Sequence, residues 1–144
     1  MSWPRIDGMR AMELGRPGES RRRFNGYVLH GEKRATAGLL ALDYEQEDEP
    51  VEQVGELLAL VDDDGRAIAT LRVTDVAVRR FADVPWEFAQ AEGEGFTSIE
   101  HWRDGHRRFW SRDGVDVTDD TRVVCVEFDV VDAPGSAAAE VDGD

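Results

Sequence analysis

The chain has 144 residues, a length that favours a single domain with one hydrophobic core. Its net charge is −14, and 41% hydrophobic with 33% charged residues is typical of a water-soluble globular protein. No apolar run approaches the ~20 residues of a membrane span, and the first residues lack a signal-peptide pattern. We therefore expect no membrane partner. The lone Cys125 lies in an apolar run, which predicts a buried thiol in a reducing cytoplasm.

The amino-terminal part is expected to contain helices. Residues 1–17 are predicted to form an N-terminal extension with a short helix over residues 9–14. Apolar and aromatic residues then recur at i, i+3 and i+4, which predicts a helix over residues 19–30. Gly31 follows where a left-handed residue ends a helix.

A second short helix is predicted over residues 36–44, with Thr36 as its capping residue. Lys33 would then lie in a turn between two helices, near backbone N–H groups that favour anions.

The middle of the chain predicts a β-hairpin. Residues 56–61 form an apolar strand, Asp62 to Gly65 a turn, and residues 67–78 the return strand. The apolar register changes parity near Thr74 and Asp75, which indicates a β-bulge of the kind found in bent sheets and small barrels.

The carboxyl-terminal part predicts two helices and a closing strand. The helices cover residues 85–91 and 99–110, the second opened by a capping box of Thr97 and Glu100. The closing strand covers residues 122–131. We therefore predict one α+β domain over residues 18–132, followed by a disordered acidic tail over residues 133–144.

The basic residues have an unusual composition, because Lys33 is the one lysine among 17 basic residues. Unlike arginine, a desolvated lysine can lose its proton and act as a base or nucleophile, or it can stay charged and stabilise an anion. The alternative is that a genomic bias towards arginine left one solvated lysine by chance.

The acidic residues do not exclude a phosphate-binding face. They are concentrated in residues 43–52, 62–64, 116–120 and 129–144, which contain no lysine or arginine. On the predicted helix 99–110 and just beyond it, a basic surface could follow a phosphate backbone, or it could be an ordinary solvated face; its residues are Arg103, Arg107, Arg108 and Arg112.

No metal or cofactor site is expected. The three histidines show no metal-ligand spacing, and one cysteine cannot build a zinc site. His106 shares a helical face with Trp102, so it is interpreted as a core histidine.

The segment Gly31-x-Lys33-x-x-Thr36 resembles the G-x-K-x-x-T signature of the ASCH superfamily, which is related to the PUA RNA-binding fold. The resemblance extends over about residues 20–131, through the hairpin, the Glu-rich segment 91–95 and the aromatic helix that contains Trp102. It implies a small PUA-like β-barrel with flanking helices and a cleft that contains the motif lysine.

The resemblance also implies candidate activities. Some members are similar to N4-acetylcytidine amidohydrolases, whose catalytic lysine, threonine and glutamate correspond to Lys33, Thr36 and Glu92. Gly38 stands where that branch commonly has an arginine, which favours the longer branch described as ribonucleases. Tyr27 and Gly31 join the three arginines of helix 99–110 as candidate substrate-binding residues, although core packing is the alternative for Tyr27.

These observations leave several functional hypotheses. The first is a hydrolase acting on RNA, ribonuclease-like, with RNA or a modified nucleoside as its partner. The alternatives are an N4-acetylcytidine amidohydrolase, a non-catalytic RNA-binding module, and an interaction domain that uses its acidic loop and tail. In the last two, Glu92 would be one more solvated carboxylate and Thr36 a plain cap.

Overall fold

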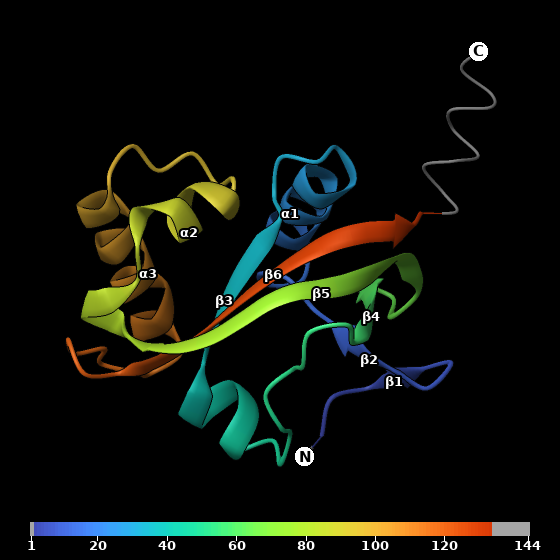
Figure 1. Cartoon of the computed structure of the whole chain (residues 1–144), viewed down its shortest axis with the longest axis horizontal. Helices are drawn as coiled ribbons and strands as arrows, with labels where there is room; N and C mark the ends of the chain where they lie inside the picture. The colour runs from blue at the N-terminus through green and yellow to red at the C-terminus, as the bar shows by residue number, and fades with distance from the viewer. Residues whose placement is uncertain (1, 134–144) are drawn as a thin grey trace.

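A computed structural model describes residues 2–133, which form one six-stranded sheet with helices (Figure 1). The strand order is β1-β2-β4-β5-β6-β3, and neighbours are antiparallel except for β2 and β4. In chain order the elements are β1 (Arg5–Ile6), β2 (Met9–Met12), α1 (Glu19–Leu29), β3 (Ala35–Leu39), the π-helical turn η1 (Leu40–Glu45), β4 (Leu57–Val61), β5 (Ala67–Arg80), the 3-10 turn η2 (Phe81–Asp83), α2 (Trp86–Ala91), α3 (Ile99–Arg112) and β6 (Arg122–Asp132).

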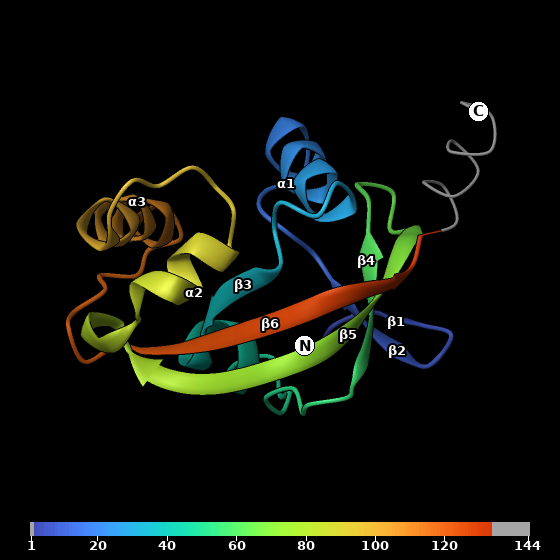
Figure 2. The same ribbon diagram turned by 45° about the horizontal axis from the view of Figure 1, so that its top comes forward.

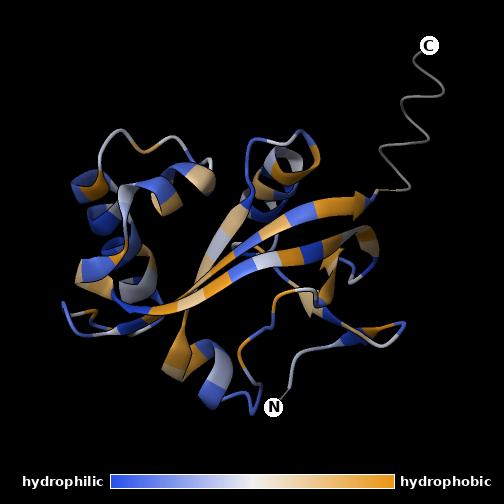
Figure 3. Cartoon of the chain, in the orientation of Figure 1, coloured by the Kyte–Doolittle hydropathy of each residue, from blue (hydrophilic) through white to orange (hydrophobic). Residues whose placement is uncertain are grey.

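The long pair of β5 and β6 is the spine of the molecule. A register shift between Val73 and Asp75 confirms the predicted β-bulge, and the two strands curve together (Figure 2). Hydrophobic and hydrophilic residues alternate along much of β5 and the second half of β6 (Figure 3), because successive side chains of a strand point to opposite faces. Residues 123–126 of β6 are instead all apolar and buried. The helices α1, α2 and α3 lie on one side of this pair, with β3 between α1 and α3 (Figures 1 and 2).

The core has two parts. One packs α1 against the middle of the sheet and includes Val28, Leu60 and Leu71. The other packs α2 and α3 against β3 and the far end of β6, and it includes Trp102 and the predicted core thiol of Cys125. The region between α1 and α3 is therefore bounded by a separate apolar cluster on each side.

The prediction of a closed β-barrel is wrong, although the α+β class is confirmed. Within residues 2–133, β1 and β3 are the two ends of the sheet order and do not pair with each other. β1 has only two residues, too few for the continuous pairing that closure requires. The outer edge of β3 consequently stays open.

Three local predictions are also wrong. Residues 9–12 form strand β2 rather than a helix, so the predicted N-terminal extension contributes to the sheet. Thr36 lies in strand β3 rather than at a helix cap, because pairing with β6 overrides the helical spacing that begins beyond it. Ser98 caps α3 in place of Thr97, since its hydroxyl accepts from the His101 N–H at 3.1 Å.

Other expectations hold or lie outside the structure. Gly31 has a φ of +82° and ends the turn after α1, as predicted. No helix of residues 2–133 is both long and apolar enough to cross a membrane. The predicted disordered tail, residues 133–144, lies outside the described residues apart from Ala133.

Candidate functional site

Lys33 lies in the short connection between α1 and β3, and backbone hydrogen bonds fix it from two sides. The Glu32 and Lys33 N–H groups both donate to the Tyr27 carbonyl in α1, at 2.9 and 3.1 Å. The Arg34 N–H donates to the Ala91 carbonyl at the end of α2, at 2.8 Å. The Lys33 side chain is thereby held in the interior, with 1% of its surface exposed.

Three acceptors surround the Lys33 Nζ. They are Glu94 Oε2 at 2.5 Å, the Glu92 carbonyl at 3.3 Å and Glu92 Oε2 at 3.5 Å. The ring of Phe24 covers the same group at 5.6 Å from its centroid. An ammonium group has three N–H donors, so each finds one acceptor. This arrangement favours an electrostatic role for Lys33 over a nucleophilic one.

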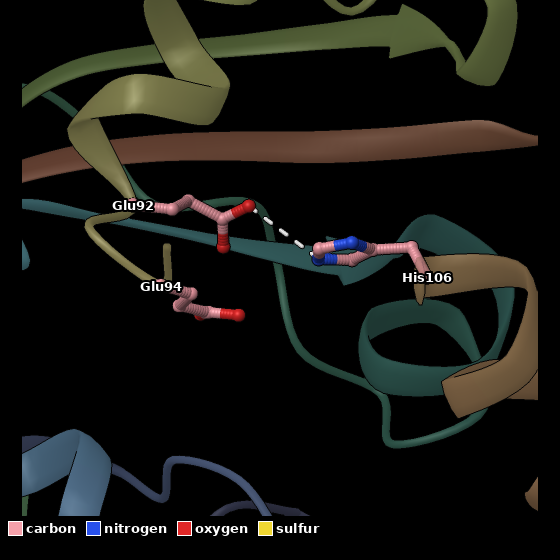
Figure 4. Close-up of side chains that lie close together, drawn as sticks. All are labelled: Glu92, Glu94 and His106. Atoms are coloured by element: carbon pink, nitrogen blue, oxygen red, sulfur yellow. Dashed lines mark ion pairs between the residues drawn. The ribbon is translucent and has the colours of Figure 1, made fainter. Parts of the chain in front are cut away.

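Glu92 is buried at the end of α2, and both of its carboxylate oxygens have partners. Oε2 faces Lys33, while Oε1 accepts a 2.5 Å hydrogen bond from the Trp102 indole N–H. His106 Nε2 lies 3.4 Å from the same Oε1, and the dashed line in Figure 4 marks this pair. Glu94 projects beside Glu92 from the following turn (Figure 4).

Both neighbours of His106 favour its protonated form. Its Nδ1 lies 2.9 Å from the Trp102 carbonyl, which can only accept, so Nδ1 carries a hydrogen. Its Nε2 faces a carboxylate, which also accepts. Burial lowers the pKa of His106, but the attraction of Glu92 outweighs burial and raises it overall.

The pKa values of the Glu92 and Glu94 carboxyl groups are shifted in opposite directions. Burial acts to raise the pKa of Glu92, but Lys33 and His106 prevail and hold that pKa below its usual range. The pKa of Glu94 is raised, because burial and the nearby Glu92 charge outweigh the attraction of Lys33. We call Lys33, Glu92, Glu94 and His106 the buried ion network; it combines two basic with two acidic side chains.

Gly93 allows the turn between the two glutamates to touch the lysine loop. Its φ is +63°, in the left-handed region, and a Cβ added there would overlap the carbonyl oxygen of Glu32. Any larger residue would push Glu92 and Glu94 away from Lys33.

The ion network lines a cavity of about 400 Å³ between α1, β3 and α3, which we call the lysine cavity. This volume lies within the usual range of small-ligand sites, roughly 300 to 1,000 Å³. Aromatic rings from three segments contribute to its wall, namely Phe24, Phe96 and Phe109. Three arginines also line it, namely Arg23, Arg108 and Arg112. The cavity thus combines flat apolar surfaces with cationic groups.

The structure brings the three predicted catalytic residues together, since Lys33, Thr36 and Glu92 all line the lysine cavity. Of the predicted substrate-binding residues, Arg108 does so as well. Their catalytic and binding roles stay predictions.

The other predicted substrate-binding residues do not line the cavity. Tyr27 and Gly31 shape the lysine loop through backbone hydrogen bonds. Arg103 donates to the Ala82 carbonyl at 2.9 Å, and Arg107 pairs with Asp104 at 3.1 Å. The predicted arginine surface therefore divides: Arg108 and Arg112 line the cavity, whereas Arg103 and Arg107 do not.

The sequence analysis did not assign Glu94 or Arg23 to the site, and it placed Arg112 only on the wider basic surface. Glu94 was within the Glu-rich segment already singled out, and its two-residue spacing from Glu92 across a glycine was the available signal. The two arginines carried no such signal, because their convergence depends on how α1 packs opposite α3.

A metal-type set of ligand atoms is also present. Glu92, Glu94 and His106 each offer one within 4.8 Å of the others. The Lys33 Nζ already contacts both carboxylates, so a divalent cation would have to displace an ammonium group. The arrangement favours the internal lysine as the resident cation.

We predict that Gly93→Ala lowers the free energy of unfolding by more than Gly95→Ala does. Both glycines have positive φ, so each change costs about 1 kcal/mol of backbone strain. Only at Gly93 does the new Cβ also overlap backbone, whereas nothing lies within 4 Å at Gly95. Urea denaturation of both variants measures the difference, and equal losses would contradict the close approach.

We predict that His106 titrates above the ordinary histidine value of about 6.5. Its stabilising contribution is then fully present below that pH and is lost as the pH rises through the raised pKa. NMR titration of the imidazole gives the midpoint, and Glu92→Gln should lower it because the carboxylate is removed while burial remains. A wild-type midpoint below 6.5 would refute the paired imidazolium.

Comparisons with known proteins agree with the observed fold. The ASCH domain profile matches residues 10–132. The ASCH domain from Lactobacillus crispatus JV V101 is 32% identical, with a TM-score of 0.73, over 85% of this chain and 79% of that one. Protein EF3133 from Enterococcus faecalis V583 is 28% identical, with a TM-score of 0.75, over 92% and 80%. None of the curated proteins matches. The profile covers most of the chain, and the protein therefore belongs to the ASCH domain family.

Proposed function

We propose that this protein binds RNA, holds one nucleobase in the lysine cavity and hydrolyses a bond of that nucleotide. The carrying observation is the contact of Lys33 with Glu94 at the cavity wall, a cation and a carboxylate in a largely water-excluded site. Preorganised charged groups stabilise the charge that develops in a transition state more strongly in a low-dielectric cavity than in water. The aromatic wall suits a base, and the three lining arginines suit its phosphates.

Glu94 is the better general base of the two glutamates. Both oxygens of Glu92 are engaged, whereas the Glu94 side chain is 14% exposed and its raised pKa makes it more basic. Glu94 takes a proton from water as the water oxygen bonds to a carbonyl carbon. Lys33 donates to the oxyanion, the carbon–nitrogen bond breaks, and Glu94 returns the proton to the departing nitrogen. Glu92 then positions Lys33, and the Thr36 hydroxyl orients the water.

The charge arrangement favours an amide over a phosphodiester. Glu92 and Glu94 flank Lys33, so a phosphate at this point would meet two negative charges. An amide on the base is neutral and needs only a donor for its oxyanion. This supports the N4-acetylcytidine amidohydrolase hypothesis over the ribonuclease-like one that sequence alone favoured.

A non-catalytic RNA-binding module is the second candidate. It is favoured by the three protein acceptors that already satisfy the Lys33 ammonium. In that case the lining arginines provide the affinity, and binding weakens steeply as salt rises.

We predict that the wild-type protein removes the acetyl group from an RNA oligonucleotide that carries one N4-acetylcytidine. Lys33→Ala and Glu94→Gln should each lower the rate by at least ~100-fold, the usual contribution of such groups. Glu87→Gln, which changes an exposed carboxylate on α2, serves as the matched control and should retain full activity. Mass spectrometry of the products measures the outcome.

The products separate the hypotheses. If the wild-type protein produces shortened fragments and Lys33→Ala does not, the protein is a ribonuclease and the amidohydrolase hypothesis is refuted. If the oligonucleotide binds but stays chemically unchanged, the non-catalytic RNA-binding module is the remaining hypothesis. Full activity in Glu94→Gln would refute the role given to that residue.

A further inference from the structure

A second cavity of about 410 Å³ adjoins the lysine cavity along β3. The two cavities share six lining residues, Leu14, Gly15, Thr36, Ala37, Phe109 and Trp110. Together they form one cleft with two halves, and Phe109 contributes to both. We call the second half the acceptor chamber, after the carboxylates Asp43 and Glu52 and the phenol of Tyr44 in its wall.

The open edge of β3 contributes backbone groups where the two halves meet. The Phe128 N–H donates to the Arg34 carbonyl at 3.0 Å, so this pair is hydrogen-bonded across the strands. In an antiparallel ladder such pairs alternate, so the N–H and C=O of Ala37 face away from β6. The Leu39 N–H obeys the same alternation, because it donates outward to Asp43 Oδ2 at 2.8 Å. The Ala37 groups are therefore directed towards the cleft.

The polar wall of the acceptor chamber is rich in hydrogen-bond acceptors. Asp43 uses Oδ2 for the Leu39 N–H, and within residues 2–133 its Oδ1 has no hydrogen-bond partner. The Tyr44 hydroxyl donates to Glu52 at 2.9 Å, which leaves the phenol oxygen free to accept. Burial raises the pKa of both Asp43 and Glu52, because their charges are poorly hydrated. A ligand that brings N–H donors would satisfy them.

The remaining wall is aromatic and suits a flat ring. Trp3, Phe109 and Trp110 line the chamber, and Trp3 packs edge-on against Tyr44 with 5.0 Å between centroids. Bases of single-stranded RNA commonly stack on such rings while polar groups read their edges. The one arginine in this wall, Arg16, is already paired with Asp113 at 2.7 Å. The chamber therefore suits a neutral base rather than a phosphate.

We propose that the acceptor chamber holds the base next to the one in the lysine cavity, and that it selects guanine. The proposal rests on the proposed function, since it assumes that RNA occupies the first half of the cleft. Guanine presents N1–H and N2–H₂ side by side, and these two donors meet a wall in which Asp43 Oδ1 and the Tyr44 phenol oxygen are both free to accept. Cytosine and adenine present a single amino group beside acceptors, and uracil a single N–H between two carbonyls. Asp43 is the reading residue.

The test measures binding of unmodified dinucleotides, in which cytidine is joined on either side to guanosine, adenosine, cytidine or uridine. Cytidine is the product of the proposed reaction, so no turnover disturbs the titration. The guanosine dinucleotide of one orientation should bind about tenfold more tightly than its uridine counterpart. Fluorescence-detected or calorimetric titration gives the dissociation constants, and cytidine alone is the reference.

Two variants assign the effect. Asp43→Asn keeps an oxygen for the Leu39 N–H but turns an NH₂ donor towards the chamber, so the preference for guanosine should disappear. Asp113→Asn alters a carboxylate in the same wall that Arg16 already occupies, and the preference should persist. Circular dichroism verifies that both variants fold, and the wild-type series alone tests the preference if one does not.

The outcomes separate this proposal from the proposed function. If every dinucleotide binds as cytidine does, the chamber is no base subsite, and the proposed amide hydrolysis in the lysine cavity is unaffected. A preference that survives Asp43→Asn would overturn the role of Asp43. If neither cytidine nor any dinucleotide binds and acetylated RNA is untouched, the proposed function fails and this proposal fails with it.

Discussion

The buried ion network is the constraint on which the candidate site depends. Lys33 and Glu92 have 1% and 2% of their side-chain surface exposed, so neither charge could be tolerated alone. Glu92 lies in reach of Lys33, Trp102 and His106 at once, and these come from the lysine loop and from α3. The network thereby holds together the segments that enclose the lysine cavity, and removing one partner leaves an unpaired buried charge.

Local charge, rather than net charge, decides what can approach this cleft. The protein carries a net charge of −14, which would repel a polyanion at long range. The network pairs two basic with two acidic side chains, and Arg23, Arg108 and Arg112 line the lysine cavity. The acceptor chamber is instead acidic, with Asp43 and Glu52 in its wall. This contrast suits an RNA strand whose phosphates lie over the arginines while its bases enter the lysine cavity and the acceptor chamber.

Patterns within one element and the hairpin of β4 and β5 were predictable, whereas most contacts between segments far apart in the sequence were not. The bulge near Thr74 followed from the parity of apolar residues along one strand, and the turn at Gly31 from one residue type. Thr36 was misassigned because its strand conformation comes from pairing with β6, a segment far away in the sequence. The lone lysine marked the site, yet Glu94 went unrecognised because nothing local shows which of two neighbouring acids reaches the cavity.

The geometry also gives a physical reason for a lysine at position 33 in a chain that otherwise uses arginine. The three acceptors converge on one point, with Glu94 Oε2 at 2.5 Å and the carbonyl and Oε2 of Glu92 at 3.3 and 3.5 Å. An ammonium group is a compact charge with three donors, whereas a guanidinium spreads five donors over a rigid plane. Arginine would leave buried N–H groups without acceptors, at a cost of about 1–3 kcal/mol each. A bias towards arginine can therefore replace exposed lysines freely, but the shape of this network opposes the same replacement at Lys33.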